Sequence, residues 1–239
     1  MWSGIRLRGS SFERALLDYR DAEYAGRSPT TGENAYLLIF GELADVPLAH
    51  RSLHIDSMVL FLNRWACHFP TRTTNTRIAL SSWMAREVES LQALADVDLS
   101  DPEAPRQCRE CERLYTSLME LQSPSEGPSI PTMGPAAASK ILHLMMPPLF
   151  VMWDRRIKRG LDYGEFLLRM HSLAVRIREL APDEALAPDE ARADIESYLQ
   201  GTLGYPVRKP LAKYIDEYNW WLAWGVAAPA RENAKQTSR

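Results

Sequence analysis

The chain has 239 residues, of which 46% are hydrophobic and 25% are charged. This is an ordinary globular composition, and a chain of this length can bury a sizeable core as one large domain or two small ones. The formal net charge of −3 gives no support to broad electrostatic binding of nucleic acid. Local basic patches and backbone amides are still able to bind phosphate groups without a basic total.

The hydrophobic periodicity is helical almost throughout the chain, and no strand-type alternation persists. We therefore expect an all-α fold. A segment rich in proline, serine and glycine, at residues 122–135, is the best candidate for a boundary between subdomains. In chain order, helices are expected at residues 10–26, 33–44, 53–69, 76–95, 103–121, 136–146, 162–180, 181–201 and 207–225.

Cysteine usage and hydropathy indicate where the protein works. The three cysteines, Cys67, Cys108 and Cys111, indicate a reducing compartment without a disulfide framework. Cys108 and Cys111 form a lone C-x-x-C with no second pair, so we expect two incidental helix cysteines and no metal site. No continuous apolar segment is typical of a signal peptide or long enough to span a membrane. We expect a cytoplasmic protein with no membrane partner.

The most informative stretch runs from Ile130 to Arg156. Gly134 followed by Pro135 predicts the start of a helix, with proline at its first position. Two prolines at 147–148 predict the end of that helix, and an apolar run then stops at Asp154. Taken residue by residue, this is a turn, a helix, a loop and an aspartate that caps the next helix.

The same stretch resembles the helix-hairpin-helix DNA glycosylases. In that family a hairpin of the approximate form L-P-G-V-G-x-K-T-A is followed by a catalytic aspartate. Pro131, Gly134, Ala138 and Leu142 fall in register with the hairpin, and Asp154 arrives at the matching distance. The chain departs from the pattern at two places, which are the first hairpin glycine, replaced by Thr132, and the Schiff-base lysine of bifunctional members, replaced by Ala136. Lys140 lies one helical turn beyond that lysine position.

The resemblance implies a fold and an activity. It implies a single glycosylase-like domain over residues 1–239, made of two helical subdomains with a helix-hairpin-helix element and a cleft between them. The N-terminal subdomain would cover about 1–122, the hairpin and the acid about 130–160, and the C-terminal helices, packing back on the core, about 161–228. The activity would be monofunctional base excision from double-stranded DNA, leaving an abasic site without lyase activity.

The resemblance also assigns roles to residues. Asp154 would be catalytic, as an anion that stabilises an oxocarbenium-like transition state and orients or deprotonates water. No iron–sulfur cluster and no obligate protein partner are expected, and the hairpin carbonyls are a possible site for a monovalent cation. DNA contacts are expected from Thr132, Met133, Gly134, Ala136, Lys140, Arg155 and Arg156.

The target base would have to leave the stack and enter a pocket. Asp56 and Asn63 are polar residues of an apolar helix and lie on one face of it, at positions i and i+7. Candidate pocket residues are Asp56, Asn63, Trp65, Asn34, Tyr218 and Trp221, although an aromatic stripe at helical spacing is more often core than pocket.

Several alternatives stay open. The chain looks like a phage-defence glycosylase that removes glucosylated hydroxymethylcytosine from phage DNA, and repair of oxidised or alkylated bases in host DNA is the other enzymatic function considered. A non-catalytic helix-hairpin-helix DNA-binding module, or a helical interaction protein, would need Asp154 only as a helix cap. A basic segment containing Arg208, Lys209 and Lys213 either contacts DNA or covers the aromatic surface of the last helix.

Overall fold

A computed structural model gives the fold and describes residues 11–24, 32–65, 67, 74–122, 132–153, 157, 160–179 and 188–225. These residues form helices and turns and contain no strand, which confirms the all-α prediction. The elements are α1 (Ser11–Tyr24), α2 (Gly32–Leu43), the 3₁₀ helix η1 (Leu48–His54), α3 (Ile55–Arg64), α4 (Thr74–Ala93), α5 (Ala104–Met119), α6 (Pro135–Met145), α7 (Tyr163–Glu179), α8 (Pro188–Leu203), α9 (Leu211–Trp220) and the π-helix η2 (Trp221–Gly225).

Helix α6 begins where the sequence predicts it. Gly134 has a positive φ of 74°, a conformation that favours glycine, and Pro135 takes the first helical position. The predicted helix at 53–69 is instead shorter and composite. Its first two residues, Leu53 and His54, belong to η1, and α3 ends at Arg64, because Trp65 leaves the helical region with φ −90° and ψ 17°.

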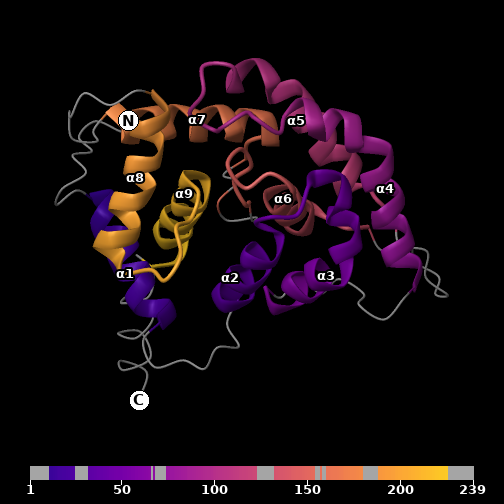
Figure 1. Ribbon diagram of the computed structural model, residues 1–239, viewed down its shortest axis with the longest axis horizontal. Coiled ribbons are helices and arrows are strands. Elements are labelled where there is room, and N and C mark those ends of the chain that lie inside the picture. Colours follow the sequence, from indigo (N-terminus) through magenta and orange to yellow (C-terminus); the bar gives the residue numbers. More distant parts are fainter. Residues whose placement is uncertain are drawn as a thin grey trace.

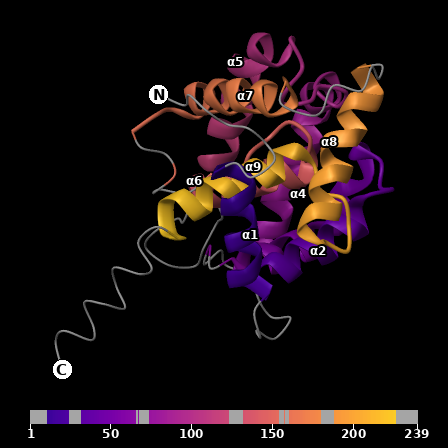
Figure 2. The same ribbon diagram turned by 90° about the vertical axis from the view of Figure 1, so that its left-hand side faces the viewer.

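The first helix of the chain packs with the last ones. Helix α1 contacts α8, α9 and η2, and the three α-helices lie together on one side of the molecule in Figure 1. Helices α3, α4 and α5 lie on the other side, with α2 and α6 between the two groups (Figure 1), and Figure 2 gives the view from the side of α1 and α8. Helices α5 and α7 pack against each other and join the two sides. The chain therefore returns at its end to cover the helix at its start.

Stacked aromatic rings fix the segment after α6 between α5 and α7. The ring centroids of Tyr115 and Tyr163 are 4.1 Å apart, and those of Trp153 and Tyr163 are 5.0 Å apart. Tyr163 also donates a hydrogen bond from its hydroxyl to the carbonyl of Val151, at 3.0 Å. Offset stacking and burial of three large rings stabilise this junction beyond what buried area alone supplies.

An arginine from η1 caps the C-terminal end of α6. The Nη1 atom of Arg51 donates hydrogen bonds to the carbonyls of Leu144 and Met145, at 2.8 and 2.6 Å. The last carbonyls of a helix have no partner within the helix, and a cation there also complements the helix dipole. Arg51 thereby attaches η1 to the end of α6.

The two glycines of α2 give a matched test of the packing. A Cβ at Gly32 would lie 2.8 Å from the indole ring of Trp65, whereas a Cβ at the exposed Gly41 would meet nothing within 4 Å. We predict that Gly32→Ala lowers the free energy of unfolding by about 1–3 kcal/mol through overpacking. Gly41→Ala is expected to raise it by up to about 1 kcal/mol, because alanine is the better helix former. Urea unfolding of both variants checks this, and equal effects would contradict the contact with Trp65.

Candidate functional site

Backbone contacts join the residues that follow α5 to the residues that precede α6. Gln122 and Thr132 form an isolated antiparallel bridge. The amide of Met133 donates to the carbonyl of Leu121 at 3.0 Å, and the amide of Gly134 donates to the carbonyl of Met119 at 3.1 Å. The backbone that follows α5 and the backbone that precedes α6 are thus held side by side by hydrogen bonds.

These bonds decide which amides remain at the start of α6. The amides of Met133 and Gly134 are already used, Pro135 has no N–H, and no side chain of the described residues caps this helix. The first amides of a helix lack partners within it. An anion at this end would therefore meet the amides of Ala136 and Ala137 and the positive end of the helix dipole. Thr132 is exposed beside them.

Asp154, Arg155 and Arg156 lie outside the described residues, but the residue before them is well defined. Trp153 is buried, and its amide donates to the hydroxyl oxygen of Ser139 at 3.0 Å. The same hydroxyl donates to the carbonyl of Trp153, also at 3.0 Å. Ser139 belongs to the second turn of α6. The backbone at Trp153 is therefore attached directly to α6.

Lys140 lies on the inner side of α6. Its side chain is only 6% exposed, and its ammonium group is 5.2 Å from the ring centroid of Trp65. Among the described residues, Lys140 has no hydrogen-bond or ion-pair partner, and its ammonium group lies over the indole face of Trp65 and acts on the buried carboxylate of Asp216. A lysine predicted to contact DNA is thus placed inside the molecule.

Behind Trp65 lies a buried ionic cluster, which is formed by Glu33, Lys209, Lys213, Asp216 and Glu217. Each of these residues is 5% exposed or less. Lys213 Nζ lies 3.1 Å from an oxygen of Glu33 and 3.1 Å from an oxygen of Asp216. Lys209 Nζ pairs with Glu33 and lies 2.7 Å from Glu217. The cluster joins α2 to α9 and to the segment just before α9.

Hydroxyl groups and rings complete this cluster. Tyr19 donates to Glu33 at 3.2 Å, and Tyr205 donates to Glu217 at 3.0 Å. The ammonium of Lys209 is 3.5 Å from the ring centroid of Tyr205, and that of Lys213 lies over the rings of Tyr36 and Trp65. Buried charges are stable only when paired and hydrogen-bonded, and these groups meet that condition.

The carboxylates of the cluster differ in their pKa. Burial raises the pKa of Glu33, but Lys213 and Lys209 outweigh burial and bring this pKa down to about 2. Burial also raises the pKa of Asp216, which Lys213 and Lys140 offset only in part, and the pKa of Glu217, which Lys209 and Lys213 offset only in part. Glu33 is therefore the carboxylate that holds its negative charge most firmly between the two lysines.

His143 is a buried neutral imidazole in α6. Its Nδ1 is 2.5 Å from the carbonyl of Phe150, and its Nε2 is 3.1 Å from the hydroxyl of Tyr36. A carbonyl only accepts, so Nδ1 carries the proton and Nε2 accepts from Tyr36. Burial lowers the pKa of His143 to about 3 and holds the pKa of Tyr36 well above its ordinary value. His143 therefore links α6 to α2 without a charge.

The structure separates the candidate pocket residues. Asp56 is exposed and pairs with Arg77 at 2.7 Å, and Asn63 donates to the carbonyl of Val59 in its own helix. Tyr218 is buried and packs on Phe12. Trp65 is the candidate that faces the ionic groups, while Asn34 and Trp221 are half-buried.

The basic segment 208–213 has a role that the sequence analysis missed. Lys209 and Lys213 are fully buried in the ionic cluster, and Arg208 is exposed beside Glu196, at 3.7 Å. The signal was present as Lys209, Lys213 and Glu217 at positions i, i+4 and i+8, with Glu33 in an apolar helix. Charges at that spacing usually mark an exposed helix face, and the partner on α2 is remote in sequence.

The remaining site predictions concern metals and membranes. Cys108 and Cys111 are free and buried in α5, and burial raises the pKa of Cys111 to about 12, so it stays a thiol. Among the described ranges, no group of His, Cys, Asp and Glu side chains is arranged to hold a metal ion. In the same ranges, no helix has the length and apolar character needed to cross a membrane.

Comparison with known proteins identifies no relative of this chain. No family model, no curated protein and no solved structure matches the chain. Its function is therefore argued from its own residues.

Neighbouring basic residues test the cluster. We predict that Lys209→Met lowers the free energy of unfolding by about 3–5 kcal/mol, because Glu33 and Glu217 lose a shared buried counter-ion. Arg208→Met removes a similar charge from the exposed surface and is expected to cost about 0–1 kcal/mol. Chemical denaturation of the two variants gives the comparison, and a Lys209→Met protein as stable as Arg208→Met would show that the cluster does not support the fold.

The neutral state of His143 predicts a pH dependence. Between pH 6.5 and about 3 the unfolded chain binds a proton at this imidazole and the folded chain does not. The free energy of unfolding therefore falls as the pH falls, by about 1.4 kcal/mol per pH unit from this group. Glu33 acts in the same direction only below pH 4.5, since its contribution is present above that value and is lost as the pH falls towards 2.

The window from pH 6.5 to 4.5 isolates this effect when wild type is compared with His143→Gln. Asp216 and Glu217, whose raised pKa acts in the opposite direction, are common to both proteins. We expect the variant to show a flatter dependence of urea-unfolding midpoint on pH. Parallel curves would mean that His143 is not a buried neutral group.

Proposed function

We propose that this protein is a monofunctional DNA N-glycosylase, acting in the cytoplasm on double-stranded DNA with a modified base. The observation that carries the proposal is the pair of hydrogen bonds between Ser139 and Trp153. They attach the residue before Asp154 to α6, the helix whose first amides are free to bind an anion. One helix would then fix the position of the phosphate-binding amides relative to the carboxylate of Asp154.

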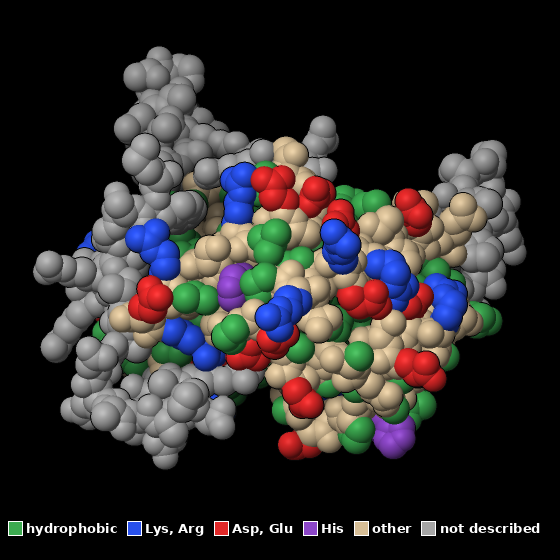
Figure 3. Space-filling view, turned by 90° about the horizontal axis from the view of Figure 1, so that it is seen from above, with side chains coloured by type: hydrophobic (Ala, Val, Ile, Leu, Met, Phe, Trp, Pro, Cys, Tyr) green, Lys and Arg blue, Asp and Glu red, His purple; other side chains and the backbone are tan. Residues whose placement is uncertain are grey.

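Phosphate binding in this proposal rests on backbone and not on net charge. The amides of Ala136 and Ala137, with the helix dipole, suit a phosphate oxygen whatever the DNA sequence. Figure 3 shows the face that carries α5 and α7, where basic and acidic side chains are interspersed. On these helices Arg113 pairs with Glu110 and Arg169 pairs with Glu165. Such a face gives no continuous basic surface for DNA. Phosphate binding by the backbone amides at the start of α6 therefore carries more weight in the proposal.

Asp154 would stabilise the positive charge that develops on the sugar as the N-glycosidic bond breaks. Water would then attack the sugar carbon, and the product would be an abasic site in an intact strand. The absence of a lysine at Ala136 supports hydrolysis without a covalent amine. Lys140, the lysine of α6, is buried against Trp65. This position favours a structural role for Lys140 over a role as a covalent amine.

The substrate we propose is glucosylated hydroxymethylcytosine in phage DNA, with antiviral defence as the biological role. Oxidised or alkylated bases in host DNA are the alternative. Duplexes carrying each type of base, with an unmodified duplex as reference, distinguish the two when abasic sites are counted by alkaline cleavage.

The test of Asp154 uses a second capping aspartate as its control. Asp162 is exposed, and its carboxylate accepts a hydrogen bond of 2.6 Å from the amide of Glu165 at the start of α7. We predict that Asp154→Asn reduces the rate of abasic-site formation by at least about 100-fold, the scale of losing one charge-stabilising group. Asp162→Asn is expected to leave the rate unchanged within a factor of two to three, since it alters only a helix cap.

Each result of this test has a defined meaning. Equal excision by Asp154→Asn and wild type would remove Asp154 from the chemistry. Binding of DNA without abasic sites on any substrate would support a non-catalytic helix-hairpin-helix module. Absence of both binding and excision would refute the proposal as a whole.

A further inference from the structure

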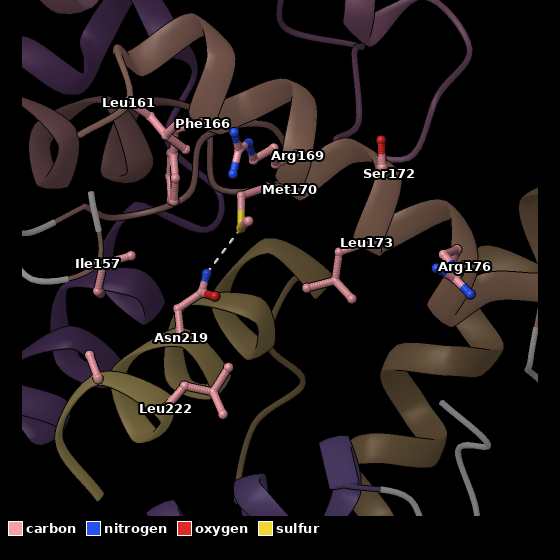
Figure 4. A pocket seen from close by; sticks show the side chains of 11 residues that line it. Ile157, Leu161, Phe166, Arg169, Met170, Ser172, Leu173, Arg176, Asn219 and Leu222 are labelled. Atoms are coloured by element: carbon pink, nitrogen blue, oxygen red, sulfur yellow. Dashed lines mark hydrogen bonds between the residues drawn. The ribbon is translucent and has the colours of Figure 1, made fainter. Parts of the chain in front are cut away.

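A cavity of about 370 Å³ lies between α7 and the C-terminal helices. Its volume falls in the range of small-molecule sites. Figure 4 shows the side chains around it, with Asn219 of α9 among Ile157, Met170 and Leu222. The lining is mostly apolar, and the residues are Ile157, Leu161, Phe166, Arg169, Met170, Ser172, Leu173, Arg176, Asn219, Leu222 and Ala223.

The one buried amide in this lining is poorly satisfied. Asn219 is 8% exposed, and its Nδ2 donates to the sulfur of Met170 at 3.0 Å, as the dashed line in Figure 4 marks. A thioether sulfur is a weak acceptor. The carboxamide oxygen of Asn219 accepts no hydrogen bond from the described residues. A polar ligand atom in the cavity would give this oxygen a hydrogen-bond partner.

The charged groups of the lining are both basic. Arg169 and Arg176 are exposed and lie two turns apart on α7, and none of the described residues that line the cavity is acidic. Arg169 is paired with Glu165 at 2.8 Å. Arg176 has no ion-pair partner among the described residues, so its guanidinium is free to bind an anion.

We propose that this cavity binds a small organic anion with a flat apolar body. The apolar body lies against Phe166, Met170 and Leu173, and a hydrogen-bond donor on it reaches the oxygen of Asn219. The anionic group binds Arg176 at the rim. This site is independent of base excision, and its tests involve no DNA.

A pair of fluorescent probes tests the proposal on the full chain. The anion 8-anilinonaphthalene-1-sulfonate has a flat apolar body, an N–H donor and a sulfonate, and N-phenyl-1-naphthylamine is its neutral analogue. We expect the anion to bind at one site per chain, about ten-fold more tightly than the neutral probe, as one charge-assisted interaction supplies. Arg176→Gln should remove this preference without weakening the neutral probe, and Arg169→Gln should retain it. Equal effects of Arg176→Gln on both probes would overturn the assignment of the anion to Arg176.

Two further measurements locate the site. Leu173→Trp fills the cavity and should abolish binding of both probes, whereas Leu168→Trp, on the exposed side of the same helix, should not. In wild-type protein with labelled methionine methyl groups, the Met170 resonance should shift on addition of the anion. Because this last measurement uses the wild-type protein, it holds even if Leu173→Trp fails to fold. An unmoved Met170 signal, or undiminished binding by a folded Leu173→Trp protein, overturns the proposal.

Discussion

The pairing of Glu33 with Lys209 and Lys213 is the interaction on which the rest of the structure depends. Two ammonium groups and the carboxylates around them are removed from water, and each is costly to bury alone. The charges are tolerated only when α2 and α9 are held together, so the cluster fixes the relation between an early helix and a late one. Lys213 extends this constraint to the ring of Trp65, and through it to the buried ammonium of Lys140 on α6.

Helix α6 is consequently held from several directions. His143 ties it to Tyr36 on α2, Ser139 ties it to Trp153, and Arg51 closes its C-terminal carbonyls. At its N-terminal end, by contrast, no side chain of the described residues caps the helix. A helix that is rigid in its interior and open at one end suits a site that must position a charged ligand accurately. These contacts are the physical basis of the proposal that α6 supports both phosphate binding and Asp154.

Local signals in the sequence predicted the helices, the start of α6 at Gly134 and Pro135, and the core positions of α5 and α7. These features depend on periodicity and on backbone preferences, which act over a few residues. The burial of Lys209 and Lys213 was not predictable in the same way, because Glu33 lies 176 residues from Lys209 in the chain. The early end of α3 also depends on a tertiary contact, since the indole of Trp65 packs over Gly32. Asp154 remains a sequence-based prediction, supported by the geometry of Trp153.

The most direct measurement of the central claim is mass spectrometry of the small molecules released from modified DNA. The purified protein is incubated in excess with duplex DNA in which one strand carries glucosylated hydroxymethylcytosine, beside duplexes with oxidised, alkylated and unmodified bases. We predict release of the free glucosylated base and an intact strand that carries one abasic site. Full recovery of every modified base within intact DNA would contradict base excision by this protein.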